Sequence, residues 1–253
     1  MGILRRCPVP WLPLHKQEQY RERYKALKPS WQPATEVYES LVAGYLGPEA
    51  KVLDVGCGRG GVLERLHPKA ALSAGIDVDI PSLREHRAPA VKRVAAKAED
   101  IPFANESFDL VICSWVLEHL REPEAAFREI GRVLKPGGHF VFLTPNALHP
   151  IPLLNRLSPG RLQRVLVPGF YGRAEEDTFS VVYRANAERD IERFARKAGM
   201  ERVSLHYIED PTYIAINDFF FRLGILMERF IPSRCKVHLV GDYIKSHPGN
   251  RPG

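Results

Sequence analysis

The chain has 253 residues, of which 45% are hydrophobic and 26% charged, so it can bury a substantial core and is neither disordered nor fibrous. Its formal net charge of +6 comes from basic residues spread along the chain without an aromatic-basic RNA motif, which disfavours nucleic acid as a partner. The four cysteines lack any C-x-x-C spacing and no ligand cluster accompanies them, which disfavours disulfides and a bound metal.

No stretch is long and apolar enough for a signal peptide or a membrane span, so we expect a soluble cytoplasmic protein and leave its oligomeric state open. Residues 1–47 are predicted to form an N-terminal arm and a helical cap. The arm is rich in proline, and the helical pattern that follows is broken near Pro29 and Pro33. Residues 48–253 are predicted to form one further domain.

Short apolar segments alternate with helical segments in the first part of this domain. Strands are predicted at residues 51–55, 72–77, 90–95, 108–114 and 139–143. Helices are predicted at 61–66 and 123–134, with the sequence KPGG at 135–138 ending the second helix. Strand, helix, strand at this spacing predicts a parallel sheet covered by helices on both faces.

A long segment, residues 147–185, then interrupts the alternation and contains several prolines and glycines. An insertion of this length in a compact domain is typically functional, and we expect it to help build an acceptor pocket. A helix at 187–198 follows, with Asn186 predicted as its N-cap and Gly199 after its end. Two last strands, 202–208 and 236–245, flank a strongly apolar helical segment at 211–232.

The sequence VLDVGCGRGG at 52–61 contains a glycine loop that fits two cofactor patterns. The dinucleotide fingerprint G-x-G-x-x-G is satisfied by Gly56, Gly58 and Gly61. The pattern D-x-G-x-G-x-G is satisfied by Asp54, Gly56, Gly58 and Gly60. Asp77 closes the second predicted strand, 21 residues after Gly56, where its carboxylate can accept hydrogen bonds from ribose hydroxyls. Both patterns therefore predict a cofactor that contains adenosine.

Three features favour S-adenosylmethionine over a nicotinamide cofactor. Asp54 lies at the end of the first strand, where a carboxylate suits an amino group and a sulfonium but not a pyrophosphate. AEDIPF at 98–103 precedes the fourth strand and can pair with an adenine edge. The one Y-x-x-x-K pair, Tyr24 and Lys28, lies before the nucleotide-binding unit. A nicotinamide-dependent oxidoreductase is kept as the alternative.

Four motifs in the same order resemble the class I S-adenosylmethionine-dependent methyltransferases, in particular the group of ubiquinone-biosynthesis and other small-molecule enzymes. They are VLDVGCGRGG, GIDVD, AEDIPFANESFDLVICSWVLEHL and EIGRVLKPGGHFVFLTPN. The resemblance implies an α/β, Rossmann-like fold with a seven-stranded sheet, parallel except for one strand near the C-terminus. The residues that it assigns to the cofactor are Asp54, Gly56, Cys57, Gly58 and Gly60 in the loop, Asp77 at the ribose, Val78, Ala98 and Glu99 at the adenine, and Ser114 below the methyl donor. Lys97 departs from the family, which often has an acidic residue there.

The acceptor is expected to be a small molecule, with O-methylation slightly preferred to N- or C-methylation. His119 is the candidate general base, because its ordinary pKa suits neutral pH; the alternative is a residue that orients the start of a helix. Glu118 is interpreted as a surface carboxylate or as a partner of His119. His149, Tyr171 and Tyr183 are candidates for contact with the acceptor, or else packing residues.

Residues 219–230 have apolar side chains with few polar ones between them. The first interpretation is a helix that packs on the sheet edge or closes the pocket. The second is a helix that contacts a membrane surface, which suits a hydrophobic or lipid-linked acceptor. An inactive cofactor-binding scaffold at a membrane is a further alternative.

Overall fold

The structure, a computed structural model, describes residues 14–157 and 181–247. Seven strands form one sheet. They are β1 (Lys51–Val55), β2 (Leu72–Asp77), β3 (Lys92–Ala95), β4 (Phe108–Ser114), β5 (Leu134–Pro145), β6 (Met200–Ile208) and β7 (His238–Lys245). The α-helices are α1 (Leu14–Leu27), α2 (Ala34–Tyr45), α3 (Leu63–Leu66), α4 (Ile80–Arg84), α5 (Pro123–Val133), α6 (Pro150–Leu157), α8 (Glu188–Lys197) and α9 (Asp218–Phe230).

The strand order is β3-β2-β1-β4-β5-β7-β6, and every neighbouring pair is parallel except the two pairs that β7 makes. This confirms the predicted Rossmann-like α/β fold with one reversed strand. The chain order reverses between β1 and β4, and open α/β sheets have their ligand crevice beyond the carboxyl ends of the strands at such a switch point. Ligands of open α/β sheets bind at this position.

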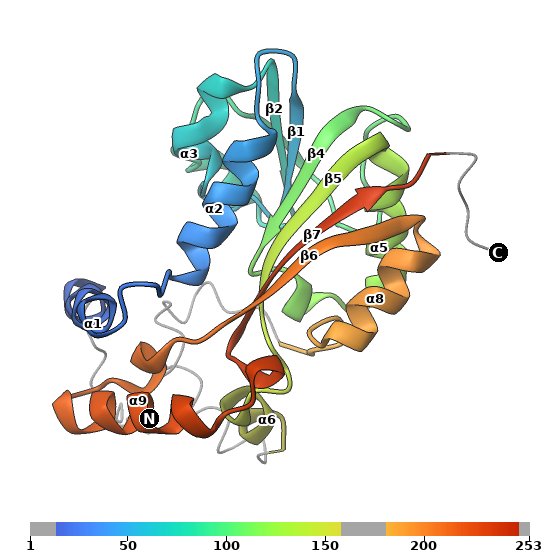
Figure 1. Cartoon of the computed structure of the whole chain (residues 1–253). Helices are drawn as coiled ribbons and strands as arrows, with labels where there is room; N and C mark the ends of the chain where they lie inside the picture. The colour runs from blue at the N-terminus through green and yellow to red at the C-terminus, as the bar shows by residue number, and fades with distance from the viewer. Residues whose placement is uncertain (1–13, 158–180, 248–253) are drawn as a thin grey trace, which may run out of the picture.

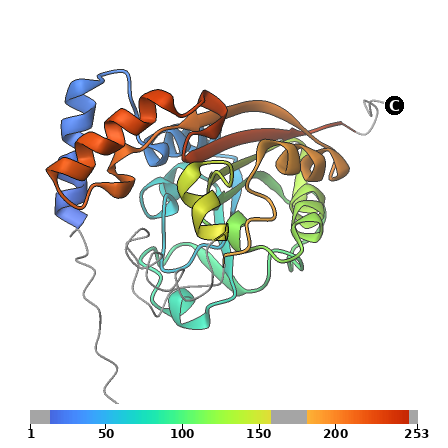
Figure 2. The same ribbon diagram turned by 90° about the horizontal axis from the view of Figure 1, so that it is seen from below.

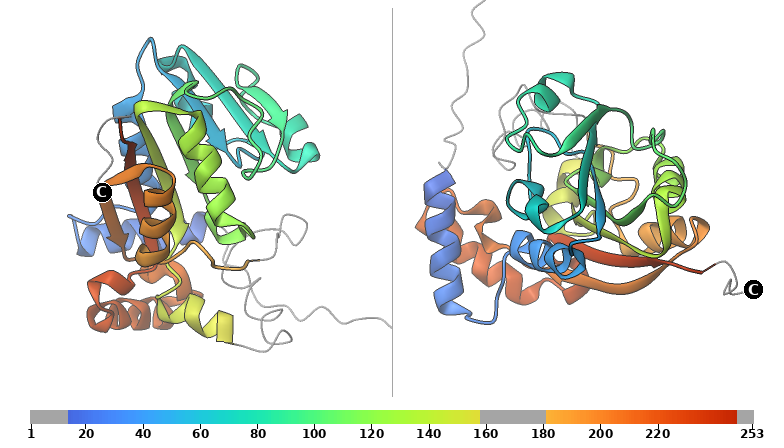
Figure 3. Two further views of the ribbon diagram at one scale, coloured as in Figure 1. Left: turned by 90° about the vertical axis from the view of Figure 1, so that its right-hand side faces the viewer. Right: turned by 90° about the horizontal axis from the view of Figure 1, so that it is seen from above.

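Helices cover both faces of the sheet and also one of its ends (Figure 1). The side chains of α2 and α3 pack in one apolar cluster with one face of the sheet, and those of α5 and α8 pack with the other face. Helices α1, α6 and α9 lie together beyond the carboxyl ends of the parallel strands, as Figures 2 and 3 show from below and from the side. These three helices therefore stand at the same end of the sheet as the crevice.

Two local predictions were wrong. β5 begins at Leu134, not at residue 139, because the KPGG segment does not end the chain's pairing with β4. The pairing shifts register there, and Gly137 takes a φ of 78°, so a bulge continues the strand. Asn186 does not cap α8: its amide donates to Thr144 Oγ1 at 2.6 Å, and Ala187 occupies the N-cap position. Gly199 does end the helix in the left-handed region, as predicted.

Candidate active site

The loop after β1 carries the cofactor glycines at the crevice between β1 and β4. Gly56 and Gly58 have φ values of 81° and 48°, a region that residues with a Cβ rarely adopt. A Cβ on Gly56 would lie 2.1 Å from Val116 Cγ2, in the segment after β4. Gly56 is therefore required both for the turn and for the close approach of the two segments.

The two glycine patterns predict different roles for Gly60 and Gly61. Gly60 has a φ of 127°, and a Cβ there would lie 2.5 Å from Glu64 Oε1. A Cβ on Gly61 would meet no atom within 4 Å. The third glycine of a dinucleotide loop is needed for close packing of helix on strand. Gly61 has no such packing, whereas Gly60 has a backbone conformation that favours glycine. The loop therefore fits D-x-G-x-G-x-G and not the dinucleotide pattern.

Asp77 ends β2 with its carboxylate beside this loop. Gly58 N donates to Oδ2 at 2.8 Å and Asp79 N donates to Oδ1 at 2.9 Å. Two ionised oxygens offer about four acceptor positions, so roughly two remain for the hydroxyls of a ribose. Val78 comes next, and its apolar side chain is 52% exposed, as expected of a residue that packs on a flat ring.

Asp54 is a buried carboxylate at the carboxyl end of β1, only 5% exposed. Burial, with a smaller contribution from the charge of Asp77, raises the pKa of Asp54 to about 7. No ion pair involves Asp54 within the described parts of the chain. A cation that bound beside Asp54 would stabilise its charged form, and the amino and sulfonium groups of S-adenosylmethionine supply this charge.

Cys57 belongs to the loop, but its side chain is buried against the sheet. A Cβ on Gly75 of β2 would lie 2.7 Å from Cys57 Sγ, so the thiol packs against the strand. Only the backbone of Cys57 is then placed to contact a cofactor.

The AEDIPF turn is held in place by α5, through two residues that were not identified from the sequence. Glu129 Oε2 accepts from Ile101 N at 3.0 Å, and Arg132 Nη2 donates to Ile101 O at 2.7 Å. The two side chains form an ion pair at 2.7 Å. Their i,i+3 spacing on a predicted helix was the available signal. In the turn itself, Ala98 is buried, Glu99 is half-buried and Lys97 is exposed.

The segment after β4 contains the candidate base. His119 is half-buried, and its Nε2 lies 3.9 Å from Glu118 Oε1. Glu118 is not a surface carboxylate: it is 4% exposed and accepts from Thr144 Oγ1 at 3.1 Å. The remaining interpretation, that Glu118 helps to hold His119, fits this geometry. Catalysis by His119 stays a prediction.

Ser114 and Tyr38 lie together at the end of β4. Ser114 is half-buried, and the hydroxyl of Tyr38, from α2, faces Ser114 and Cys113. The Tyr38 hydroxyl is buried and makes no hydrogen bond of good geometry. A buried tyrosine hydroxyl beside the expected methyl donor was not anticipated from the sequence.

Of the three predicted acceptor contacts, Tyr171 lies outside the described residues. His149 is buried, and its Nδ1 accepts from Ile151 N at 3.2 Å while its Nε2 lies 3.9 Å from Glu228 Oε1. Both nitrogens thus face groups of α6 and α9. Tyr183 is buried, with a φ of 50°.

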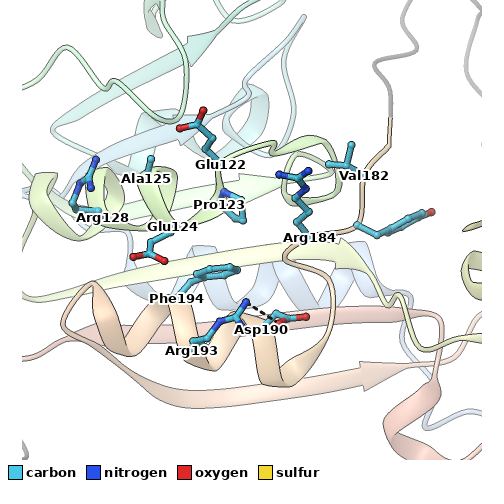
Figure 4. A pocket seen from close by; sticks show the side chains of 11 residues that line it. Glu122, Pro123, Glu124, Ala125, Arg128, Val182, Arg184, Asp190, Arg193 and Phe194 are labelled. Carbon is cyan, nitrogen blue, oxygen red and sulfur yellow. Dashed lines mark ion pairs between the residues drawn. The ribbon is translucent and has the colours of Figure 1, made fainter.

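Tyr183 also lines a cavity of about 740 Å³ between α5 and α8 (Figure 4). Its walls carry charges of both signs, including Arg193 and Asp190, which pair at 3.0 Å. None of the predicted cofactor residues lines this cavity. Among the described residues, no group of three or more His, Cys, Asp or Glu side chains is arranged to hold a metal ion.

A glycine loop, an acidic strand end and an adenine turn at the switch point define an α/β protein that binds an adenosine cofactor. Residues 53–142 match the family described as "Methyltransferase domain". The demethylmenaquinone methyltransferase of Corynebacterium kroppenstedtii is 34% identical over 155 residues, 59% of this chain and 66% of that protein. The ubiquinone biosynthesis O-methyltransferase of Alkalilimnicola ehrlichii is 35% identical over 103 residues, 38% of this chain and 42% of that protein.

The chain thus spans about two thirds of the first relative's length and less than half of the second's. Among solved structures, the geranyl diphosphate C-methyltransferase from Streptomyces coelicolor superimposes with a TM-score of 0.60 at 13% identity, over 92% of this chain and 84% of that one, which shows a shared fold. The chain belongs to the class I S-adenosylmethionine-dependent methyltransferases, and S-adenosylmethionine is its cofactor.

Proposed function

We propose that the protein methylates a hydrophobic small molecule, with a hydroxyl oxygen as the preferred acceptor atom. The observation that carries the proposal is Asp54, a buried carboxylate that forms no ion pair within the described chain and stands beside a glycine loop at the switch point. This arrangement suits a cofactor that is positively charged at its reacting end. A pyrophosphate would be repelled there.

S-adenosylmethionine supplies a methyl group already activated by its sulfonium. The protein's part is to hold the acceptor in line and to exclude water, and such positioning can contribute about 7–11 kcal/mol. The loop glycines, Asp54 and Asp77 hold the cofactor, and Ser114 and Tyr38 line the end of β4 where the acceptor approaches. His119, whose Nε2 lies 3.9 Å from Glu118 Oε1, is the candidate base that takes a proton from a hydroxyl acceptor.

Two observations support a hydrophobic or lipid-linked acceptor. The two relatives are named for demethylmenaquinone and for ubiquinone biosynthesis, both of which concern quinones. The helices at this end of the sheet include α9, which exposes the large apolar side chains of Phe219, Leu226 and Phe230. An aromatic hydroxyl compound with an apolar tail fits both.

Transfer of a labelled methyl group tests the proposal. The protein is incubated with methyl-labelled S-adenosylmethionine and either a lipid extract or an aqueous extract of the host, with Gly56→Ala as the inactive control. We expect label in the lipid extract, in a product whose new methyl group is bonded to oxygen. Cofactor binding without label in either extract would instead support an inactive scaffold, and binding of NADH in a parallel calorimetric titration would support an oxidoreductase.

We further propose that α9 rests on the cytoplasmic surface of a membrane. Phe219, Leu226 and Phe230 are 69%, 50% and 79% exposed on one helix, and Arg222 and Arg229 are exposed beside them. Apolar side chains that enter the lipid, with arginines that meet anionic headgroups, are typical of interfacial helices. No helix in the described chain is long and apolar enough to cross a bilayer.

Flotation with vesicles tests this contact. We expect the protein to float with phosphatidylcholine vesicles that contain phosphatidylglycerol, and to float less without it. The combined change Phe219→Ser, Leu226→Ser and Phe230→Ser should remove most of the binding. Val203→Ser, at an equally exposed apolar residue of β6, is the matched control and should bind as before. Absence of the wild-type protein from both vesicle fractions would rule the contact out.

A further inference from the structure

His238 is a buried histidine with two ring nitrogens that lack hydrogen-bond partners. It is the first residue of β7 and pairs with Pro145 of β5 and Ile208 of β6. The residue is 4% exposed, and neither Nδ1 nor Nε2 has a partner among the described residues. Buried polar atoms are nearly always paired in native proteins, so two orphaned nitrogens on one ring indicate a missing partner.

Two aromatic rings flank His238. The ring centroid of Trp115 lies 5.2 Å from that of His238 at an interplanar angle of 82°, and that of Tyr213 lies 5.6 Å away at 65°. The neighbouring charged groups are engaged elsewhere. Asp210 accepts from Thr212 N at 3.0 Å and lies 3.7 Å from Arg21, so it does not pair with the imidazole.

The chemical state of His238 restricts what it can bind. Burial lowers the pKa of His238 to about 4; the nearby charge of Arg21 lowers it further, and Asp210 opposes both. The imidazole is therefore neutral at physiological pH and has one N–H donor and one acceptor nitrogen. A neutral group that both donates and accepts, such as a hydroxyl, is its natural partner, and an anion is not.

The position of His238 places it within reach of the methyl donor. It stands at the same end of the sheet as Ser114, two strands away, because β5 lies between β4 and β7. Two strand spacings amount to about 10 Å, which two fused aromatic rings cover only together with a polar substituent and the reach of the imidazole side chain. Trp115 follows Ser114 directly and contacts His238, so it spans this interval. The buried Tyr38 hydroxyl lies at the Ser114 end of the interval.

We propose that His238 binds a hydroxyl or carbonyl group of the methyl acceptor, and that Trp115 and Tyr213 pack against the acceptor's flat ring system. His238 is then a specificity-determining residue that selects acceptors with a polar group about two rings from the methylated atom. The proposal rests on the proposed function, because the methyl donor defines the other end of the interval. It concerns acceptor binding alone and leaves cofactor binding unaffected.

A pair of small probes tests the proposal. 2-Naphthol and 2-methylnaphthalene have nearly the same shape, and only the first carries a hydroxyl. Each is titrated into the protein saturated with S-adenosylhomocysteine, with binding measured by calorimetry. We expect the wild-type protein to bind 2-naphthol about tenfold more tightly, as for one net hydrogen bond in a buried site.

Three variants identify the residue responsible. His238→Phe should abolish the preference for 2-naphthol, whereas His238→Asn, which keeps a donor and an acceptor, should retain part of it. His206→Phe changes an exposed histidine of β6 and should have no effect. Because His238→Phe fills a buried site, ¹⁵N-histidine spectra of the wild-type protein give a second measurement. 2-Naphthol should shift the His238 ring signals, which are assigned by their loss in His238→Asn.

The outcomes separate this proposal from the one on which it rests. If S-adenosylhomocysteine binds but 2-naphthol does not, or if His238→Phe keeps the preference, His238 is not an acceptor-binding residue. Unchanged His238 signals on saturation with 2-naphthol lead to the same conclusion, with water as the missing partner. Failure of S-adenosylhomocysteine to bind the wild-type protein would overturn the proposed function as well.

Discussion

The cofactor side of the crevice and the side proposed for the acceptor each contain a buried titratable group, and the pKa values of the two groups are shifted in opposite directions. Burial raises the pKa of Asp54, at the end of β1, to about 7. Burial lowers the pKa of His238, at the start of β7, to about 4. In both cases burial disfavours the charged form. The difference is that a cation can restore the charge of Asp54, while the neutral imidazole of His238 needs only a hydrogen-bond partner.

The largest effect on the cofactor side is expected from Gly56→Ala. The new Cβ would overlap Val116 and would require a residue with a side chain at a φ of 81°, so the loop must move. We expect no measurable binding of S-adenosylhomocysteine by calorimetry. Gly61→Ala has open space and is the control, with wild-type affinity expected. Loss of binding in Gly61→Ala alone would restore the dinucleotide interpretation.

Asp54→Asn should stabilise the protein in the absence of cofactor. The pKa of Asp54 rises from 3.8 to about 7 on folding, so between these pH values the native state holds a proton that the unfolded state has lost. The free energy of unfolding is therefore highest at low pH and falls as the pH rises to about 7. Above pH 7 the ionised, buried Asp54 lowers it by about 4 kcal/mol. Urea unfolding at pH 8 should show the variant more stable by up to this amount, and at pH 4 the difference should vanish. Equal stability at pH 8 would mean that Asp54 is not desolvated.

Asp77→Ala removes the acceptor expected at the ribose. We predict that S-adenosylhomocysteine affinity falls by about 1.5–3 kcal/mol, the range for hydrogen bonds to a charged group. The carboxylate also accepts from Gly58 N and Asp79 N, so part of the loss comes from a looser loop. Cofactor analogues that lack one ribose hydroxyl separate the lost ribose contact from the looser loop. If Asp77 binds that hydroxyl, its removal should weaken binding to the wild-type protein but not to Asp77→Ala. If Asp77→Ala binds S-adenosylhomocysteine with unchanged affinity, the ribose does not bind at Asp77.

The smallest effect is expected at the adenine turn. Arg132→Ala breaks the contact with Ile101 O but leaves Glu129 in place, and both side chains are partly exposed. We expect S-adenosylhomocysteine binding to weaken by about 1 kcal/mol, a value discounted for exposure. Arg128→Ala, one turn earlier on the exposed side of α5, should bind as the wild type does. If both variants lose the same affinity for S-adenosylhomocysteine, the loss comes from the changed net charge of α5 and not from the adenine turn.

The strands on the cofactor side could be predicted from the sequence because each is marked by a short apolar run and by the residues next to it. β1, β2 and β4 were predicted to the residue, since each is an apolar run bounded by glycine, acidic or turn residues. The start of β5 was misplaced because KPGG usually ends an element, and only the pairing with β4 keeps it extended. The partners of Glu129 and Arg132 likewise become visible only once α5 is packed.

The side proposed for the acceptor could not be predicted in the same way, because its residues are brought together by pairing across long stretches of sequence. His238 lies in an ordinary strand pattern, and nothing near it in the sequence indicates the rings of Trp115 and Tyr213. Tyr38 came from the predicted N-terminal helical cap, yet it presents a buried hydroxyl to Ser114. The burial and the neighbours of such polar atoms are a property of the folded structure alone.

Proton release on cofactor binding tests most directly whether Asp54 is the partner of a cationic cofactor. Calorimetric titration of S-adenosylmethionine at pH 7, in two buffers with different ionisation enthalpies, measures the protons released. With the pKa of free Asp54 at about 7, binding of a cation should release about half a proton, and Asp54→Asn should release none. Binding without proton release in the wild-type protein, or equal release in Asp54→Asn, would contradict the account.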